Sequence, residues 1–97
     1  MIHYRHGDLL IVEIPEIPRP AKPSTEKVLA YGEATGHAHR IDTAQLLTVG
    51  DTMYVWVDQS ARLTHEEHRT IELPRGAYRV VRQREYTGPQ RDRWVED

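Results

Sequence analysis

The chain has 97 residues, 15 acidic and 13 basic side chains, a formal net charge of -2 and no cysteine. This length is enough for one domain, and the lack of cysteine excludes disulfides, thiolate metal sites and a cysteine nucleophile. The longest apolar run, LLIV at 9–12, is far too short for a membrane span or a signal peptide. We therefore expect a cytoplasmic protein that does not enter the membrane, while the oligomeric state stays open.

Short strand-like segments separated by turn signals recur in the first half of the chain. A turn at Gly7-Asp8 precedes the first of them. Residues 15–24 hold four prolines, which exclude a helix and predict an extended surface loop. Gly32 is expected at a bulge, and Gly50-Asp51 is a hairpin signal. The strands expected in this half are residues 8–14, 27–36 and 39–50.

The second half continues the same pattern. Residues 52–58 (TMYVWVD) carry apolar side chains on both faces, which predicts a central strand. Proline and glycine in LPRGAY, residues 73–78, predict a turn. The last strand should leave the core near Gln83, and residues 87–97 should be loosely ordered. The strands expected in this half are residues 52–58, 61–63, 70–73 and 77–86.

These elements together predict the fold class. No segment of useful length has a helical period, and turn signals follow one another at short spacing. The pattern predicts an all-β protein, a small β-barrel or sandwich that forms a single domain over residues 1–97.

All six histidines fall into close pairs, which are His3 with His6, His37 with His39, and His65 with His68. Neutral imidazole is the commonest metal ligand in proteins. Residues two apart on a strand face the same side, so His37 and His39 are able to address one ion. Gly36 permits a tight backbone beside them. For the pair nearest the N-terminus we expect surface positions or ordinary hydrogen bonds.

The stretch LTHEEH, residues 63–68, predicts a different local structure. Thr64 followed by Glu67 matches a capping box, so we expect a short helical turn near Thr64–His68. Such a turn places His65 and His68 on one face, where they are able to bind one cation, or one positions a substrate while the other moves a proton. Glu66 is predicted to supply an oxygen ligand, orient a histidine or act as a base, and Glu67 to cap the turn.

A third polar cluster is RQREY, residues 82–86. Arginine binds phosphate through two parallel hydrogen bonds. We expect Arg84 to stabilise an anionic transition state. The side chains expected to bind substrate are Arg40, Arg82, Gln83 and Tyr86. A charged edge strand explains RQREY equally well, and the sequence leaves both interpretations open.

The segments HGDLLIVEI, GEATGHAHRI and LTHEEHRTIELPRGAYRVVRQREY resemble a group of short, largely uncharacterised bacterial and phage proteins. The similarity covers most of the chain and implies a family rather than an activity. HAH followed by LPRGAY is also similar to the HxH and PxG segments of cupins, which implies a small β-barrel with a histidine-lined mouth. Asp42 and Thr43 stand where cupins carry a glutamate, and Tyr78 or a neighbour stands where their later metal histidine falls.

Three functions agree with these residues. The first, which we favour, is a hydrolase of a phosphate ester such as the RNA phosphodiester. Here the histidines at 37–39 and 65–68 hold Zn²⁺, Mn²⁺, Fe²⁺ or Ni²⁺. The second is a metal-free ribonuclease with a histidine acid–base pair and one of Arg40, Arg82 and Arg84. The third is a module that binds RNA or a protein without chemistry. Histidines combined with carboxylates and arginines favour the two enzymes.

Overall fold

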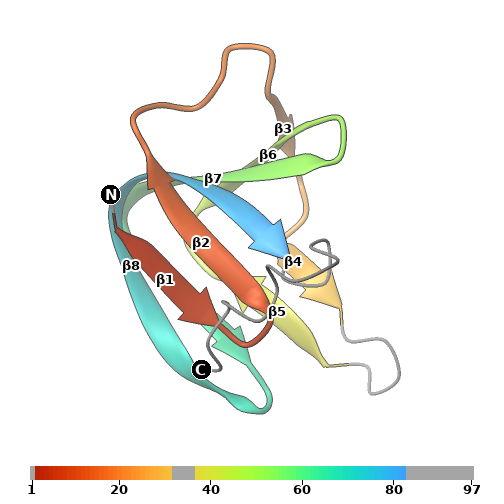
Figure 1. Ribbon diagram of the computed structural model, residues 1–97, viewed down its shortest axis with the longest axis vertical. Coiled ribbons are helices and arrows are strands. Elements are labelled where there is room, and N and C mark those ends of the chain that lie inside the picture. Colours follow the sequence, from red (N-terminus) through yellow and green to blue (C-terminus); the bar gives the residue numbers. More distant parts are fainter. Residues whose placement is uncertain (1, 32–36, 83–97) are drawn as a thin grey trace, which may run out of the picture.

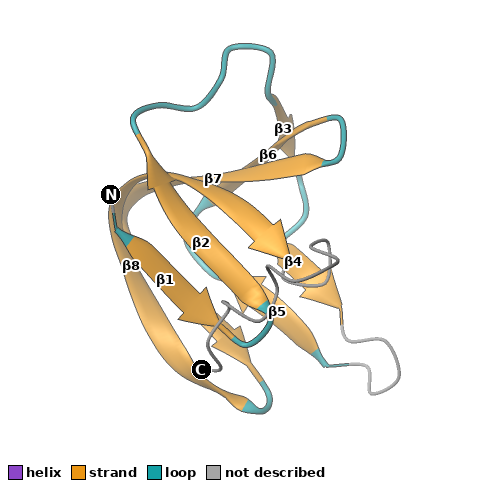
Figure 2. Cartoon of the chain, in the orientation of Figure 1, coloured by secondary structure: helices purple, strands orange, loops and turns teal. Residues whose placement is uncertain are grey.

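The computed structural model describes residues 2–31 and 37–82, and every regular element in these ranges is a strand (Figure 1, Figure 2). The all-β prediction is therefore confirmed. No helix among the described residues is long and apolar enough to cross a membrane. The strands are β1 His3–His6, β2 Leu9–Ile14, β3 Lys22–Ser24, β4 Val28–Tyr31, β5 Ala38–Ile41, β6 Gln45–Val49, β7 Thr52–His65 and β8 His68–Arg82.

The strands form one antiparallel sheet in the order β1-β2-β8-β7-β5-β4, with β6 on the other part of β7 and β3 beside β6. The long hairpin of β7 and β8 joins its two halves. At the open end of the hairpin, away from its turn, β7 pairs with β6 and β8 pairs with β2. Nearer the turn, β7 pairs with β5. The register shifts between Val57 and Ser60, and β8 curves strongly (Figure 1). The sheet thus folds over on itself in a sandwich-like arrangement and does not close into a barrel.

The core lies between the two halves of the folded sheet. Alternate side chains on each strand face the same side, so every strand contributes one apolar row to this interior. The largest fully buried apolar side chains come from both halves: Leu9, Ile11, Leu46, Val55, Val57 and Tyr78 from one, and Ile41, Leu63 and Leu73 from the other. The core therefore holds the two halves together.

The hairpin tip corrects the predicted helical turn near Thr64–His68. Glu66 and Glu67 form a two-residue turn between β7 and β8, and His65 pairs with His68 across it. The flanking strands pair up to the tip, and this long-range pairing overrides the local capping pattern. The capping role of Glu67 was wrong as well, since its amide donates to Nδ1 of His65 at 3.0 Å.

Strand β8 corrects the turn predicted at residues 73–78. Pro74 and Gly76 lie inside a continuous strand, opposite Ser60 and Val57. Gly76 has a φ of 153°, a conformation that favours glycine. Proline and glycine therefore mark the bend of the hairpin rather than a reversal of the chain. The strands predicted at 61–63 and 70–73 are parts of β7 and β8.

Several predicted boundaries hold, and others move. Turns at Gly7 and Gly50, with φ of 63° and 56°, are confirmed. Strand β1 was missed, the strand predicted at 39–50 is divided into β5 and β6, and β3 ends the proline-rich loop. β7 is central as predicted, but Trp56 is 36% exposed, so only one face of it is buried. The bulge predicted at Gly32, the end of the last strand near Gln83 and the tail at 87–97 lie outside the described residues.

Tyr78 gives a test of the core. Its hydroxyl donates to the carbonyl oxygen of Pro74 at 2.6 Å, and burial raises the pKa of Tyr78 to about 12 from its usual 10. The Tyr78→Phe substitution should lower the free energy of unfolding by about 1 kcal/mol at neutral pH. The raised pKa stabilises the folded state below pH 10, and this contribution is lost as pH rises towards 12.

Urea unfolding at neutral and alkaline pH measures both effects. Wild-type protein should lose stability above pH 10 more steeply than the variant does. Tyr54→Phe, at a half-buried position on the same hairpin, is the control. Identical alkaline profiles for wild type and Tyr78→Phe would contradict the assignment.

Candidate functional site

Five of the six histidines gather at one end of the folded sheet, and we call them the histidine cluster: His6, His37, His39, His65 and His68. Ring centroids lie 4.4 Å apart for His39 and His65, 4.6 Å for His65 and His68, and 4.9 Å for His6 and His39. The His37 ring lies 5.7 Å from that of His65. The structure thus brings both sequence pairs, 37–39 and 65–68, together with a histidine from β1.

The cluster continues the apolar rows of the core. On β5, His39 stands two residues before buried Ile41, and on β7, His65 stands two residues after buried Leu63. Since alternate residues share a face, both rings point into the interior. His6 lies opposite Leu9 and is only 2% exposed. The site is therefore the polar end of the core.

An irregularity in the hairpin decides which residue of β8 joins the cluster. Leu63 pairs with Ile71, and a regular ladder would next pair His65 with Arg69. The register instead shifts, and His65 pairs with His68. A slip of one residue exchanges the two faces of a strand. His68 consequently faces the other histidines, whereas Arg69 is exposed.

Gly7 leaves the space that the cluster occupies. A Cβ atom at this position would lie 2.6 Å from Nε2 of His68 and 3.0 Å from Cε1 of His39. The φ of 63° is also one that residues with side chains adopt at a cost. Glycine is therefore needed here for both the turn and the packing of the rings.

His6 and His39 form the buried centre of the cluster. The Nδ1 atoms of the two rings are 2.8 Å apart. Nε2 of His6 donates to the carbonyl oxygen of Arg69 at 3.0 Å, and Nε2 of His39 lies 3.2 Å from the carboxylate of Asp8. Burial, together with neighbouring His6 and His65, lowers the pKa of His39 to about 4, although Asp8 opposes the change. His39 is thus neutral near pH 7.

The outer part of the cluster contains two histidines oriented by Glu67. Nδ1 of His37 lies 3.1 Å from Oε2 of this residue, and Nδ1 of His65 accepts its amide. His37, His65 and Glu66 also offer ligand atoms that all lie within 4.8 Å of one another. This part of the site is half-buried to exposed, unlike the His6–His39 centre.

Glu66 connects the hairpin tip to β5. Its Oε1 atom accepts the amide of Ala38 at 3.0 Å, and its Oε2 atom accepts from Nη1 of Arg40 at 2.9 Å. These hydrogen bonds lower the pKa of Glu66 to about 2, and the bond from Arg40 has the largest effect. A carboxylate with so low a pKa accepts protons poorly, so the geometry favours a positioning or ligand role over that of a base.

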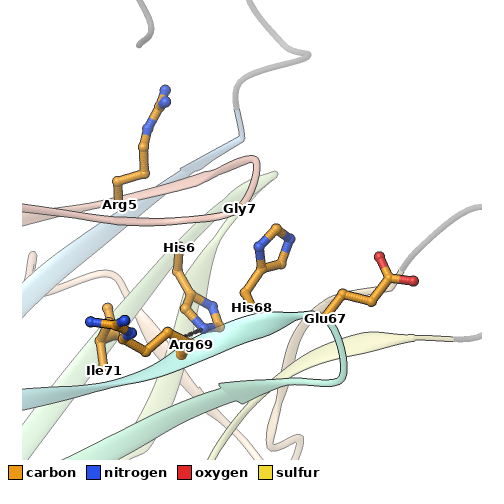
Figure 3. Close-up of a pocket in the computed structure, with 7 residues that line it drawn as sticks. All are labelled: Arg5, His6, Gly7, Glu67, His68, Arg69 and Ile71. Atoms are coloured by element: carbon orange, nitrogen blue, oxygen red, sulfur yellow. Dashed lines mark hydrogen bonds between the residues drawn. The ribbon is translucent and has the colours of Figure 1, made fainter. Parts of the chain in front are cut away.

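A pocket of about 710 Å³ opens beside the cluster, between β1 and the beginning of β8 (Figure 3). His6 points from β1 towards β8, whereas His68 points from β8 towards the Gly7 turn, and Arg5 projects from the opposite side of β1. The lining residues are Arg5, His6, Gly7, Glu67, His68, Arg69 and Ile71. Arg69 therefore lies next to the histidines, whereas Arg5 borders the pocket from the opposite side of β1.

The predicted substrate-binding residues are distributed differently. Arg40 is exposed on β5 and forms an ion pair with Glu66. Arg82 is the last residue of β8 and pairs with Leu9 of β2, and β2 separates it from β1 in the sheet. The others, Gln83, Arg84 and Tyr86, lie outside the described residues.

Sequence reasoning missed the roles of His6, Asp8, Arg5 and Arg69 at this end of the sheet. A signal was present for His6. It directly precedes the Gly7-Asp8 turn, and a strand before that turn would have placed it in the sheet.

Comparison with known proteins gives a family and no further relative. No curated protein and no solved structure matches the chain. A family model described as a domain of unknown function, DUF8820, matches residues 5–83 and so includes the whole histidine cluster. Since this match covers far more than half of the 97 residues, the chain belongs to the DUF8820 family.

Proposed function

We propose that the histidine cluster is a divalent metal centre and that the protein is a small hydrolase of a phosphate-containing substrate. The observation that carries this proposal is the convergence of five imidazoles from β1, from β5 and the residue before it, and from the tip of the β7–β8 hairpin. Imidazole is the preferred nitrogen ligand of Zn²⁺, and it also suits Mn²⁺, Fe²⁺ and Ni²⁺. Such an ion would activate water as a nucleophile towards a phosphate ester near neutral pH.

The arginines of the pocket favour an anionic substrate. Arg5 and Arg69 line the pocket that His6 and His68 also border. Guanidinium groups pair with phosphate oxygens through directed hydrogen bonds. A phosphate group bound near Arg69 in this pocket would lie beside the histidines, so its ester bond would be close to the proposed metal.

The metal-free ribonuclease is the second candidate, and the outer histidines favour it. The Glu67 carboxylate, 3.1 Å from Nδ1 of His37, favours a proton on Nδ1, which leaves Nε2 as a proton acceptor. His65 accepts an amide at Nδ1, so its neutral ring carries the proton on Nε2. One base and one acid would then stand 5.7 Å apart, measured between ring centroids. This pair needs no metal to cleave an RNA phosphodiester.

Metal content and hydrolysis, measured on untagged protein, separate the candidates. We expect close to one equivalent of bound metal and chelator-sensitive hydrolysis of bis(4-nitrophenyl) phosphate. The double variant His37→Ala/His39→Ala should lose both metal and activity. His3→Ala is the matched control, because His3 is exposed at the far end of β1 and lies outside the cluster.

Each outcome decides between the candidates. RNA cleavage that persists in chelator and disappears in His65→Ala would replace the metal enzyme with the acid–base ribonuclease. A folded protein that binds neither Zn²⁺ nor Mn²⁺ and cleaves no phosphodiester would contradict both, and would favour a module that binds RNA or a protein.

A further inference from the structure

The proton positions of the His6–His39 pair are fixed by its outer partners. A backbone carbonyl and a carboxylate accept hydrogen bonds and donate none. His6 therefore presents N–H at Nε2 to the carbonyl of Arg69, and His39 presents N–H at Nε2 to the carboxylate of Asp8. When each ring carries a single proton, its lone pair is then on Nδ1.

These two lone pairs face each other. The Nδ1 atoms stand 2.8 Å apart, with both side chains almost fully buried. Two lone pairs at this distance repel, so the contact needs either a shared proton or a metal ion between or beside the two Nδ1 atoms. An imidazole that donates one nitrogen to a carbonyl or carboxylate and offers the other is the arrangement usual for metal-binding histidine.

A third ring completes a ligand set of suitable size. The ring centroids of His6, His39 and His68 form a triangle with sides of 4.9, 5.8 and 5.9 Å. Imidazoles on one tetrahedral ion, with metal–nitrogen distances of about 2.0 Å, place their ring centroids roughly 5 Å apart. The centroid distances therefore fit one ion, but the His39 and His68 rings are nearly parallel, at 12°, so the His68 ring has to turn before one of its nitrogens faces the pair.

We infer that the metal is bound by Nδ1 of His6 and Nδ1 of His39, with His68 as the third ligand. This inference rests on the proposed function and changes its ligand set. His6 enters, while His37 and His65 are left to move protons. Asp8 and the carbonyl of Arg69 act as positioning groups that orient the two rings. Three histidines leave one coordination position for water or substrate, as in catalytic zinc sites.

Zn²⁺ titration of matched histidine-to-glutamine variants tests the ligand set. His6→Gln should weaken Zn²⁺ binding by more than the roughly 10–100-fold that loss of an outer partner costs. Asp8→Asn should weaken it within that range. His37→Gln and the control His3→Gln should bind Zn²⁺ like wild type, and circular dichroism should show that all variants are folded.

A second measurement does not depend on a variant folding. Long-range ¹H–¹⁵N spectra of the histidine rings distinguish ligation at Nδ1 from ligation at Nε2. Added Zn²⁺ should shift Nδ1 of His6 and His39 while both Nε2 atoms keep their protons. Spectra of these two rings that do not respond to Zn²⁺ would mean that they share a proton, and would overturn the inference.

The outcomes separate the inference from the proposed function. Zn²⁺ binding that His37→Gln abolishes and His6→Gln leaves intact would overturn the inference alone, because the metal centre would then lie at the outer histidines. No Zn²⁺ binding by the wild-type protein would end both proposals.

Discussion

Replacing Gly7 with alanine should both destabilise the protein and remove its affinity for metal. The added Cβ atom would lie 2.6 Å from Nε2 of His68, so the ring has to leave its present position beside His6 and His39. The left-handed φ adds about 1–2 kcal/mol, and the forced repacking a further ~1–3 kcal/mol. We expect a loss of about 2–5 kcal/mol in the free energy of unfolding. Zn²⁺ binding should weaken at least about tenfold.

Gly50→Ala is a matched control for this experiment. Gly50 also lies in a hairpin turn with a positive φ, of 56°, but no atom lies within 4 Å of its added Cβ. It should lose only the ~1–2 kcal/mol of backbone strain and keep its metal affinity. Urea unfolding and Zn²⁺ titration measure the two variants side by side. Equal effects of both substitutions would show that the contact with the histidine rings has no influence.

Leu63→Ala should have the largest effect on stability alone. Leu63 is fully buried in β7, opposite Ile71 and beside Ile41 of β5. Truncation of a buried leucine to alanine costs about 2–5 kcal/mol, a large part of the ~5–15 kcal/mol available to a domain. We expect a correspondingly lower urea midpoint. Leu47→Ala, at a half-buried position of β6, should cost about 1 kcal/mol.

The same variant tests whether the histidine cluster is thermodynamically linked to the core. Zn²⁺ at 100 times its dissociation constant should restore about 2.7 kcal/mol to Leu63→Ala, provided that only the folded state binds the ion. The rescue should be absent when His39→Ala is added. Stability that does not respond to Zn²⁺ in either background would contradict a metal centre built on the folded sheet.

The sequence predicted the strands well where a local pattern decides the structure. The apolar runs in 8–14 and 52–58 and the glycines at 7 and 50 led to the observed strands and turns. It failed where pairing between distant strands decides. Thr64 and Glu67 fit a helix cap locally, yet the ladder between β7 and β8 continues through His65. Pro74 and Gly76 have the composition of a turn, but they lie at a bend of a long strand.

The sequence predicted that histidines form the candidate site, but it identified only some of the histidines that belong to it. The pairs at 37–39 and 65–68 follow from spacing, because residues on one strand or hairpin are local neighbours. His6 enters the cluster through contacts 33 and 63 residues away along the chain, with His39 and with the Arg69 carbonyl. The one-residue shift that selects His68 over Arg69 is likewise a property of the assembled ladder. Neither feature has a local signature.

These long separations have a consequence for folding. The buried pair unites β1 with β5, and its outer bond to Arg69 requires β8, the last described strand. Contacts so distant along the chain form after large loops have closed, which is slow. A chain emerging from the ribosome therefore cannot assemble the His6–His39 pair with its partners until most of its residues have been synthesised. Any ion held there would be acquired at the end of folding, and metal capture would report that the fold is complete.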